Sequence, residues 1–449
     1  MSMKQWGVIG ISALLAIAVA CHQEPISERT PQKEVCPEYY IENQVIRDYL
    51  DFLEKVPYRD GDYTYSVIDD YYRLTTTSRK DTPLPVTLDW ETASGGSSQH
   101  IELADNPDFT DVLTYTVSGS AVSYDIYNLI PGKHYYWRVL SKSSETISHG
   151  EFITKGRRRL LKVGNICNIR DLGGIPIANS HKRIKYGLLF RGGEMNGYHQ
   201  DQSGRYCRLD PYGKTAMRHA GIAAVLDLRT DDEAGNITVS PLGENVDYIR
   251  LQNANEFYYD KCWNSDVYIQ AIQWIIDRLR EGKPVYFHCI FGADRTGTLA
   301  FLLEALLGVN ENQLAIDYEL TSFSYGLESA PRRRGPKNEL SVYRYRQMLE
   351  GLLRGSGTIQ EQVRVFLLKK YPAKTWNGSL DTWLRITRLL VQNCSDRPTI
   401  PNTALVIEIQ IIRKMVKTHF QTLVPVYRSG SSSIVSSRCQ IPPLFAIIH

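Results

Sequence analysis

The sequence predicts a mixed fold, in which an α/β domain built on a central, largely parallel sheet flanked by helices follows a separate small all-β sandwich domain. Two patterns carry this prediction. Between residues 85 and 155, apolar and polar residues alternate with period two, which is typical of half-buried strands. Between residues 156 and 392, short apolar runs alternate with helical patterns, which is typical of parallel strands joined by crossover helices.

The composition is that of a globular protein with more than one domain. At about 150 residues per domain, a chain of 449 residues has room for two or three. Hydrophobic residues make up 43% and charged residues 22%, which are ordinary values for a folded core and exclude wholesale disorder. The net charge is only +3, which argues against a general electrostatic grip on nucleic acid, so no nucleic-acid partner is expected.

Residues 1–20 are predicted to be an export signal. Lys4 precedes the uncharged stretch Gly7–Ala20, which is shorter than the roughly 20 apolar residues that span a bilayer and suits a signal peptide. Its end, Ala18-Val19-Ala20-Cys21, resembles a bacterial lipoprotein lipobox, although the usual pattern has Leu where Ala18 stands. The resemblance implies cleavage before Cys21, acylation of its thiol, and a protein anchored at the periplasmic or cell-surface face of the envelope. A plain secretory signal with an incidental cysteine is the alternative.

Residues 21–84 are predicted to be a tether that contains one amphipathic helix. Residues 22–40 mix Pro, Glu, Gln and Lys, as linkers do. Helical spacing then predicts a helix that ends before Pro57, on the positions Ile41, Val45, Ile46, Tyr49, Leu50 and Leu53.

Residues 85–155 are predicted to be the β-sandwich. The two clearest strands run through Leu113, Tyr115 and Val117 and through Tyr135, Trp137 and Val139, and the turn signals are Gly95-Gly96, Asn106-Pro107 and Pro131-Gly132. The stretch resembles a fibronectin type III or similar immunoglobulin-like module, on Trp90, Leu129, Pro131, Gly132 and Tyr135, although such modules usually have about 100 residues. We expect Trp90 and Trp137 in its core and a spacer or positioning role, with sugar or peptide binding as the alternative.

The predicted α/β domain contains a strand, a tight loop and a helix in direct succession. Earlier elements are the strands Ala223–Leu228 and Val246–Leu251 and the helix Tyr268–Arg280. The strand Pro284–Phe287 precedes the loop, and the helix after the loop carries Leu299, Leu302, Leu303, Leu306 and Leu307 and is expected to end at Gly308.

This order suits a cysteine nucleophile. The thiolate is the reactive form, and an ordinary cysteine with a pKa near 8.5 is mostly protonated at neutral pH. Cys289 opens the loop, where backbone amides and a helix N-terminus favour both its thiolate and a phosphate dianion. Arg295 can then hold two phosphate oxygens with its planar fork.

The loop sequence His288-Cys289-Ile290-Phe291-Gly292-Ala293-Asp294-Arg295-Thr296-Gly297 resembles the C-x5-R-[S/T]-G signature of the cysteine-dependent protein tyrosine phosphatase superfamily. The alternative is a buried structural cysteine beside a surface arginine. That alternative leaves unexplained why six signature residues stand in register between a strand and a helix.

Four further stretches narrow the resemblance to the bacterial tyrosine phosphatases with an N-x-R-D-x-G-G motif. They are "NICNIRDLGG" (Asn165–Gly174), "YGLLFRGGE" (Tyr186–Glu194), "AAVLDLRTDDE" (Ala223–Glu233) and "IDYELTSFS" after the loop helix. The resemblance covers about residues 160–330 and implies a tyrosine-phosphatase-like fold. Family members act on phosphotyrosine and, in some cases, on phosphoserine or phosphoinositides. In this family the general acid immediately precedes the loop arginine, which here is Asp294.

The resemblance implies a two-step reaction without metal or cofactor. Cys289 attacks phosphorus while the phosphate-binding loop (Ile290, Phe291, Gly292, Ala293 and Gly297) and Arg295 hold the oxygens. Asp294 protonates the leaving phenolate and later activates the water that hydrolyses phosphocysteine. Thr296 is expected to donate a hydrogen bond to the sulfur as it leaves.

Other polar residues are given supporting roles. We expect His288 to order the loop, and Arg170 and Asp171 to form an ion pair that holds two loops near the site, with direct substrate contact as the alternative. Three other aspartates are rivals to Asp294: Asp227, whose setting before Arg229 is interpreted as structural, and Asp260 and Asp266 upstream.

The substrate prediction depends on one departure from the family. Members active on phosphoinositides tend to carry Lys where this chain has Ala293. We therefore predict an exported, lipid-anchored phosphatase of phosphotyrosine proteins. A phosphoinositide or inositol phosphate phosphatase is the alternative, and a catalytically silent phospholigand-binding lipoprotein is a further one. The run Arg332-Arg333-Arg334 is interpreted as a solvated loop rather than a substrate contact.

The C-terminal part is predicted to contain two more helices, and six cysteines have no assigned role in catalysis or lipidation. Helical spacing returns in Ser341–Leu353 and Thr358–Tyr371, whereas residues 393–449 match nothing and receive no assignment. Besides Cys21 and Cys289 there are six cysteines, an even number that permits disulfide pairing. The chain is long enough to fold around a hydrophobic core without disulfide bonds. Cys167 lies within the family motif, and we hypothesise that it protects Cys289 by reversible disulfide formation.

Overall fold

The computed structural model describes residues 36–55, 81–91, 98–200, 206–251, 267–324, 357–370, 387 and 389–393. The predicted signal peptide, Cys21, Asp260, Asp266, the Arg332–Arg334 run, the helix 341–353 and all of the tail beyond residue 393 therefore lie outside the described residues. Among the described helices, none combines the length and the apolar character that crossing a bilayer requires. The chain divides into two compact units, and each is described by itself.

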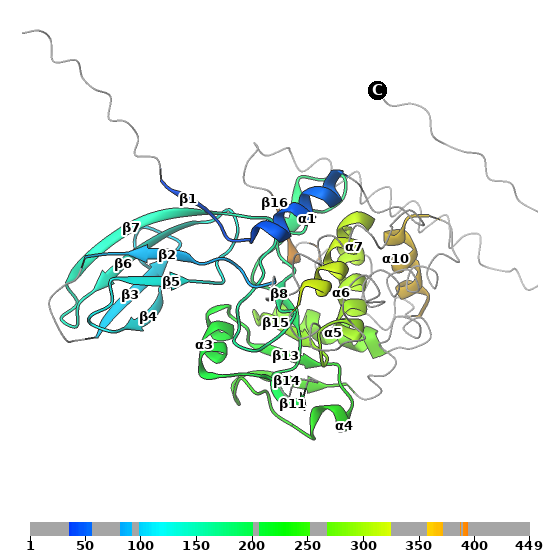
Figure 1. Ribbon diagram of the computed structural model, residues 1–449. Coiled ribbons are helices and arrows are strands. Elements are labelled where there is room, and N and C mark those ends of the chain that lie inside the picture. The colour runs from blue at the N-terminus through cyan, green and yellow to red at the C-terminus, as the bar shows by residue number, and fades with distance from the viewer. Residues whose placement is uncertain are drawn as a thin grey trace, which may run out of the picture. The chain divides into compact units, whose positions relative to one another are not determined.

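The first unit is a β-structure, as its period-two patterns predict. Its five-stranded sheet has the order β1-β7-β6-β3-β4 (Figure 1). The strands are β1 (Glu38–Tyr40), β7 (Thr146–Lys155), β6 (His134–Leu140), β3 (Gln99–Ala104) and β4 (Leu113–Val117). The pairs β7–β6, β6–β3 and β3–β4 are antiparallel. Ile101, Leu103, Val139 and Phe152 are almost fully buried, so the inward positions of these strands form an apolar core.

The two tryptophans of this unit differ in burial. Trp90 is buried as predicted, and its indole N–H donates to Gln99 Oε1 at 2.9 Å. Trp137 is only half-buried, so its prediction as a core residue is wrong. Its ring covers Gly150, its cross-strand partner, where an added Cβ would lie 2.8 Å from the indole nitrogen. A tryptophan opposite a glycine can lie flat over the neighbouring strand instead of pointing into the core.

The strands β2 (Val86–Asp89) and β5 (Ser123–Ile126) form an antiparallel pair of their own. Both belong to the second unit, although they come from the stretch predicted to be a sandwich. The strand content of residues 85–155 is thus confirmed, whereas a separate sandwich domain with these boundaries stays a prediction.

The second unit is built on a largely parallel sheet of order β14-β13-β15-β10-β8, as predicted. Its strands are β14 (Asp247–Arg250), β13 (Ala224–Asp227), β15 (Val285–His288), β10 (Leu189–Gly192) and β8 (Arg170–Asp171). The first four are parallel and β8 is antiparallel to β10. The inner strands are buried at every position, as expected for a sheet covered on both faces.

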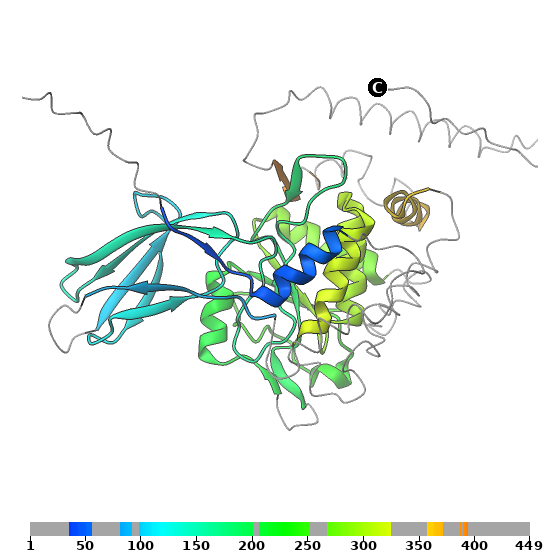
Figure 2. The ribbon, with the colours of Figure 1, turned by 45° about the horizontal axis from the view of Figure 1, so that its top comes forward.

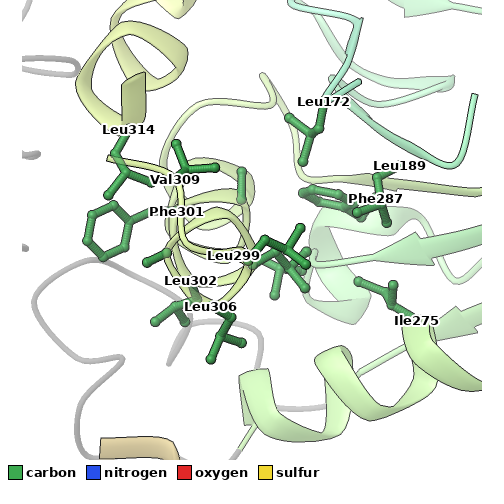
Figure 3. Packing of buried hydrophobic residues seen from close by; sticks show 14 of the residues in the cluster. Leu172, Leu189, Ile275, Phe287, Leu299, Phe301, Leu302, Leu306, Val309 and Leu314 are labelled. Atoms are coloured by element: carbon green, nitrogen blue, oxygen red, sulfur yellow. The ribbon is translucent and has the colours of Figure 1, made fainter. Parts of the chain in front are cut away.

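Helix α6 (Asp294–Leu307) is the centre of this unit, and all of its residues are buried. A helix that is mainly apolar around its whole circumference is typically covered on all sides. Leu299 points toward Phe287 and Leu189 of the sheet, whereas Phe301 lies near Val309 and Leu314 on the other side (Figure 3). The helix ends at Gly308, as predicted, because the αL conformation of that residue (φ 90°) suits glycine.

The other helices surround this core. They are α1 (Gln44–Lys55), α3 (Pro211–His219), α4 (Asp231–Ala234), α5 (Val267–Arg280), α7 (Glu311–Glu319), the 3-10 helix η3 (Leu320–Phe323) and α10 (Ile359–Lys370). Helix α1 lies along α7 (Figure 2). The predicted helices near residues 41–53, 268–280 and 358–371 are confirmed. Two small ribbons pair β11 (Asn196–Gln200) with β12 (Tyr206–Arg208) and β9 (Lys182–Ile184) with β16 (Val391–Asn393).

The strand register brings three strand ends together, two of which carry polar side chains. His288, the last residue of β15, lies beside Asp227 at the end of β13 and beside Gly192 at the end of β10. In open α/β sheets, ligands bind outside the carboxyl ends of parallel strands. Cys289 follows at this edge, so the register places the predicted nucleophile where this fold forms binding sites.

Candidate active site

Cys289 lies between the end of β15 and the start of α6, as predicted. Its side chain is only 4% exposed. The loop from Cys289 to Ala293 leads directly into the first turn of α6, whose four leading N–H groups have no partner within the helix. These groups and the helix dipole give the loop a positive potential that suits a bound anion such as phosphate.

The loop carbonyls are held from outside by neighbouring segments. The Asn168 side-chain amide donates to Phe291 O at 3.1 Å and to Gly292 O at 2.8 Å. Arg191 also donates to Gly292 O, at 2.9 Å, and the Glu194 N–H donates to Ile290 O at 2.9 Å. In a trans peptide the N–H points opposite to the C=O, so three consecutive loop amides point away from these donors. Successive amides turned to one side form the concave site that binds an anion.

The backbone conformation at position 292 and the space around it both require a glycine. Its φ is +65°, in the left-handed region that other residues rarely adopt. An added Cβ would lie 2.4 Å from the backbone carbon of Gly192, the end of the neighbouring strand. The loop therefore packs directly on β10, which fixes its height above the sheet.

The N-x-R part of the family motif acts through a buried ion cluster. Arg170 Nε donates to Asp317 Oδ1 at 2.8 Å, and Arg191 Nη1 contacts Asp317 Oδ2 at 2.5 Å. Arg170 also donates to the Asn168 side-chain oxygen, which leaves the Asn168 amide hydrogens for the loop. Burial opposes ionisation of Asp317, but the two arginines outweigh it and hold the pKa of this carboxyl well below its usual range.

Arg170 and Asp171 do not pair with each other as predicted. Asp171 instead pairs with Arg159 at 3.0 Å and accepts the N–H groups of Gly173 and Gly187. Neighbouring residues of a strand point to opposite faces, so one motif supplies an ion pair on each side of β8. The predicted ion pair is therefore wrong, and the predicted role of holding loops near the site stays a prediction.

Arg295 is held by a residue to which the sequence analysis gave no role. Its guanidinium contacts both carboxylate oxygens of Glu233, at 2.5 and 3.0 Å, and donates to Leu228 O at 2.9 Å. Burial opposes ionisation of Glu233, but the hydrogen bonds from Arg295 and from the Thr230 backbone outweigh it and lower the pKa of the carboxyl. The anionic fork fixes the plane of the arginine. The sequence signal, Thr230 followed three residues later by Glu233, indicates only a capping box, which is also formed.

His288 and Asp227 are structural, as predicted. The His288 ring contacts Cys289 O through Nδ1 at 3.1 Å, and burial lowers the pKa of the imidazole to about 4. Asp227 is buried against Arg229 at 2.7 Å and accepts the Tyr248 hydroxyl at 2.9 Å, which removes it as a rival general acid. His288 therefore stays neutral near pH 7 and orders the loop.

Asp294, Thr296 and Cys167 complete the surroundings of the loop. Asp294 is the first residue of α6 and is 9% exposed. The Thr296 hydroxyl is buried and has no hydrogen-bond partner among the described residues, so its bond to the departing sulfur stays a prediction. The Cys167 thiol forms no disulfide among the described residues and donates to Phe291 O at 3.9 Å. Cys167 thus contacts the loop, and its predicted disulfide with Cys289 stays a hypothesis.

Comparison with known proteins supports the interpretation of this unit. Residues 161–350 match the family described as "Tyrosine phosphatase family". A protein of Cupriavidus necator named "Putative tyrosine-protein phosphatase" is 26% identical over 183 residues, which are 36% of this chain and 62% of that protein. The match thus spans less than two thirds of this relative.

"Triple specificity protein phosphatase PtpB" of Mycobacterium tuberculosis is 21% identical over 225 residues, which cover 39% of this chain and 76% of that protein. A crystal structure of P. aeruginosa TpbA aligns with 15% identity and a TM-score of 0.25, over 43% of this chain and 96% of that one. Over residues 161–350 the chain is therefore similar to tyrosine phosphatases.

Glu233→Ala should lower kcat/KM about 100-fold, because the loop arginine loses the carboxylate that fixes its plane. Inorganic phosphate should also inhibit more weakly. Glu233→Gln, which keeps a hydrogen-bonding group, should restore part of the kcat/KM and part of the inhibition by phosphate. Steady-state kinetics with an aryl phosphate measure these effects. Asp232→Ala, which removes an exposed acid of the same helical turn, is the control, and an equal loss in both variants would contradict the role.

The folded state should lose stability as pH falls from about 6.5 to about 4. The folded-state pKa of His288 is about 4 and the unfolded value about 6.5, so in this window the unfolded chain binds the extra proton. The loss should reach about 3 kcal/mol at the acidic end. Urea unfolding across this range should show a flatter pH dependence for His288→Asn. The exposed His181 provides the control, and a slope unchanged by His288→Asn but flattened by His181→Asn would refute the assignment.

Proposed function

We propose that the protein is an exported, lipid-anchored phosphatase that hydrolyses phosphotyrosine in proteins through a phosphocysteine intermediate. One observation carries the chemistry: a cysteine at the end of a parallel strand is followed by a loop whose carbonyls are bound from outside and whose arginine is clamped by a carboxylate. The lipobox-like sequence ending in Cys21 supports export and anchoring.

The proposed reaction has two displacements. The Cys289 thiolate attacks phosphorus, the bond to the aryl oxygen breaks, and Asp294 gives its proton to that oxygen. Water then attacks the phosphocysteine with Asp294 as the base, which releases phosphate and restores the thiolate. The loop amides and Arg295 bind the three equatorial oxygens throughout, where charge develops. Every charge that these steps need is supplied by side chains and backbone of this chain.

Two features favour phosphotyrosine over phosphoinositides. Cys289 is 4% exposed, so a phosphate must be carried to it on an extended arm such as a phenyl ring. Ala293 adds no charge for further phosphates of a polyphosphorylated headgroup. The Mycobacterium tuberculosis relative is named for triple specificity, so phosphoesters other than phosphotyrosine, including phosphoserine and phosphoinositides, belong in the same assay.

Cys289→Ser should abolish turnover of a phosphotyrosine peptide without loss of folding, because the hydroxyl is a far weaker nucleophile than the thiolate. Wild type should hydrolyse the peptide without added metal and show vanadate inhibition. Phosphate release from a phosphotyrosine peptide and from a phosphoinositide, on the same preparation, measures both points. Turnover that survives in Cys289→Ser, or that requires a divalent cation, would contradict the proposal.

Asp294→Asn should separate the general acid from a structural role at the start of α6. Protonation matters most for a poor leaving group, so phosphotyrosine turnover should fall by about 10²–10⁴-fold. Turnover of an activated ester such as p-nitrophenyl phosphate, whose phenolate leaves without help, should fall much less. Equal losses on the two esters would show that Asp294 only supports the loop. Asp232→Asn provides an exposed aspartate as the matched control.

A further inference from the structure

A cysteine, a histidine and a glutamate converge on the sheet of the first unit, away from the phosphatase sequence motifs. Cys36 lies two residues before β1, His134 is the first residue of β6, and Glu151 lies on β7. These strands are neighbours in the sheet order β1-β7-β6. One potential ligand atom from each residue lies within 4.8 Å of the other two. A sulfur, a nitrogen and an oxygen atom that could each bind a metal ion thus lie close together.

The distances between these atoms suit a tetrahedral cation. Cys36 Sγ lies 3.6 Å from His134 Nε2, and that nitrogen lies 3.0 Å from Glu151 Oε2. With zinc bonds of about 2.3 Å to sulfur and about 2.0–2.1 Å to nitrogen and oxygen, tetrahedral angles give separations of about 3.6 and 3.3 Å. The observed separations therefore need only a small adjustment to become two edges of a zinc site.

His134 cannot satisfy Cys36 and Glu151 at once, and the other acceptor of the Cys36 thiol, Pro37 O, lies at 4.0 Å. Cys36 and Glu151 both approach the same ring nitrogen. A neutral imidazole nitrogen either donates one hydrogen or accepts one, so it cannot serve as acceptor for the thiol and as donor for the carboxylate at once. A cation among the three donors would resolve the conflict, because thiolate, imidazole lone pair and carboxylate all point to positive charge.

We propose that Cys36, His134 and Glu151 form a structural binding site for a divalent soft-to-borderline cation, with Zn²⁺ as the best match. A sulfur, an imidazole nitrogen and a carboxylate oxygen are the ligand types that zinc takes, and solvent would complete the tetrahedron. The His134 and Glu151 side chains are 37% and 47% exposed, so a cation can enter from solvent. The bound ion would join three neighbouring strands at the point where the described chain enters the sheet.

Tyr136 supports this site from the other side of the imidazole. Its hydroxyl lies 3.5 Å from His134 Nδ1, and the two rings stack at a centroid distance of 4.5 Å. With Nε2 bound to a metal, Nδ1 carries the hydrogen and donates it to the tyrosine oxygen. Partners of this kind fix the tautomer and the orientation of a metal-bound histidine.

Metal binding by the purified, reduced full-length chain tests the proposal independently of phosphatase activity. All variants carry Cys289→Ser, so that the catalytic thiol cannot bind the ion. This parent should bind one Zn²⁺ by calorimetry, and Co²⁺ in its place should show the absorption of a tetrahedral site with a thiolate ligand. Cys36→Ser should abolish the thiolate band, and Tyr136→Phe should weaken zinc binding about tenfold.

A second measurement covers the case in which Cys36→Ser does not fold. Glu151→Gln keeps the shape of the side chain and removes its charge, so zinc should raise the melting temperature of the parent but not of this variant. His100→Ala, which removes a histidine of strand β3 in the same sheet, should behave like the parent. A parent without stoichiometric zinc binding, a thiolate band that persists in Cys36→Ser, or equal zinc stabilisation of Glu151→Gln and the parent would overturn the proposal.

Discussion

The candidate active site depends on one constraint: a loop that offers its amides to an anion must bind its carbonyls elsewhere. Here the side-chain donors for those carbonyls are Asn168 and Arg191, and the position of both is set by Asp317, directly or through Arg170. The cluster is fully buried, where removing one partner leaves an uncompensated charge and is strongly destabilising. Its arrangement is therefore fixed before any ligand arrives, which is the condition for electrostatic catalysis.

Two carboxyl groups in the same buried region differ in their ionisation because their surroundings differ. Asp317 faces two arginines and stays ionised, whereas burial, followed by the charge of Asp317, raises the pKa of Glu304 on α6 well above its usual range. A neutral Glu304 leaves Asp317 as the counter-ion of both arginines. The guanidinium groups are therefore oriented by one acid and not shared between two, which keeps Arg191 directed at the loop.

The local part of the site could be predicted from sequence, and the long-range part could not. Cys289 and Arg295 lie in one loop between a strand and a helix, so spacing alone defines their geometry. Glu233 meets Arg295 across 62 residues, and its capping-box pattern with Thr230 concealed the second role. Arg170 meets Asp317 across 147 residues, so the sequence suggested the adjacent Asp171 as its partner instead. Trp137 was misjudged for a similar reason, because only the pairing of β6 with β7 shows the Gly150 it covers.

The two chemically distinct cysteine environments follow from one rule about thiolates. A thiolate needs nearby positive charge. For Cys289 the chain supplies it permanently, through the first turn of α6 and through Arg295, whose orientation Glu233 fixes. Around Cys36, burial and then the charges of Glu151 and Glu38 raise the pKa of the thiol and favour its protonated form. The first arrangement holds a nucleophile that must attack and leave, whereas the second becomes stable as a thiolate only when an external cation stays bound. A cysteine sulfur is therefore suited to catalysis in one setting and to a structural metal site in the other.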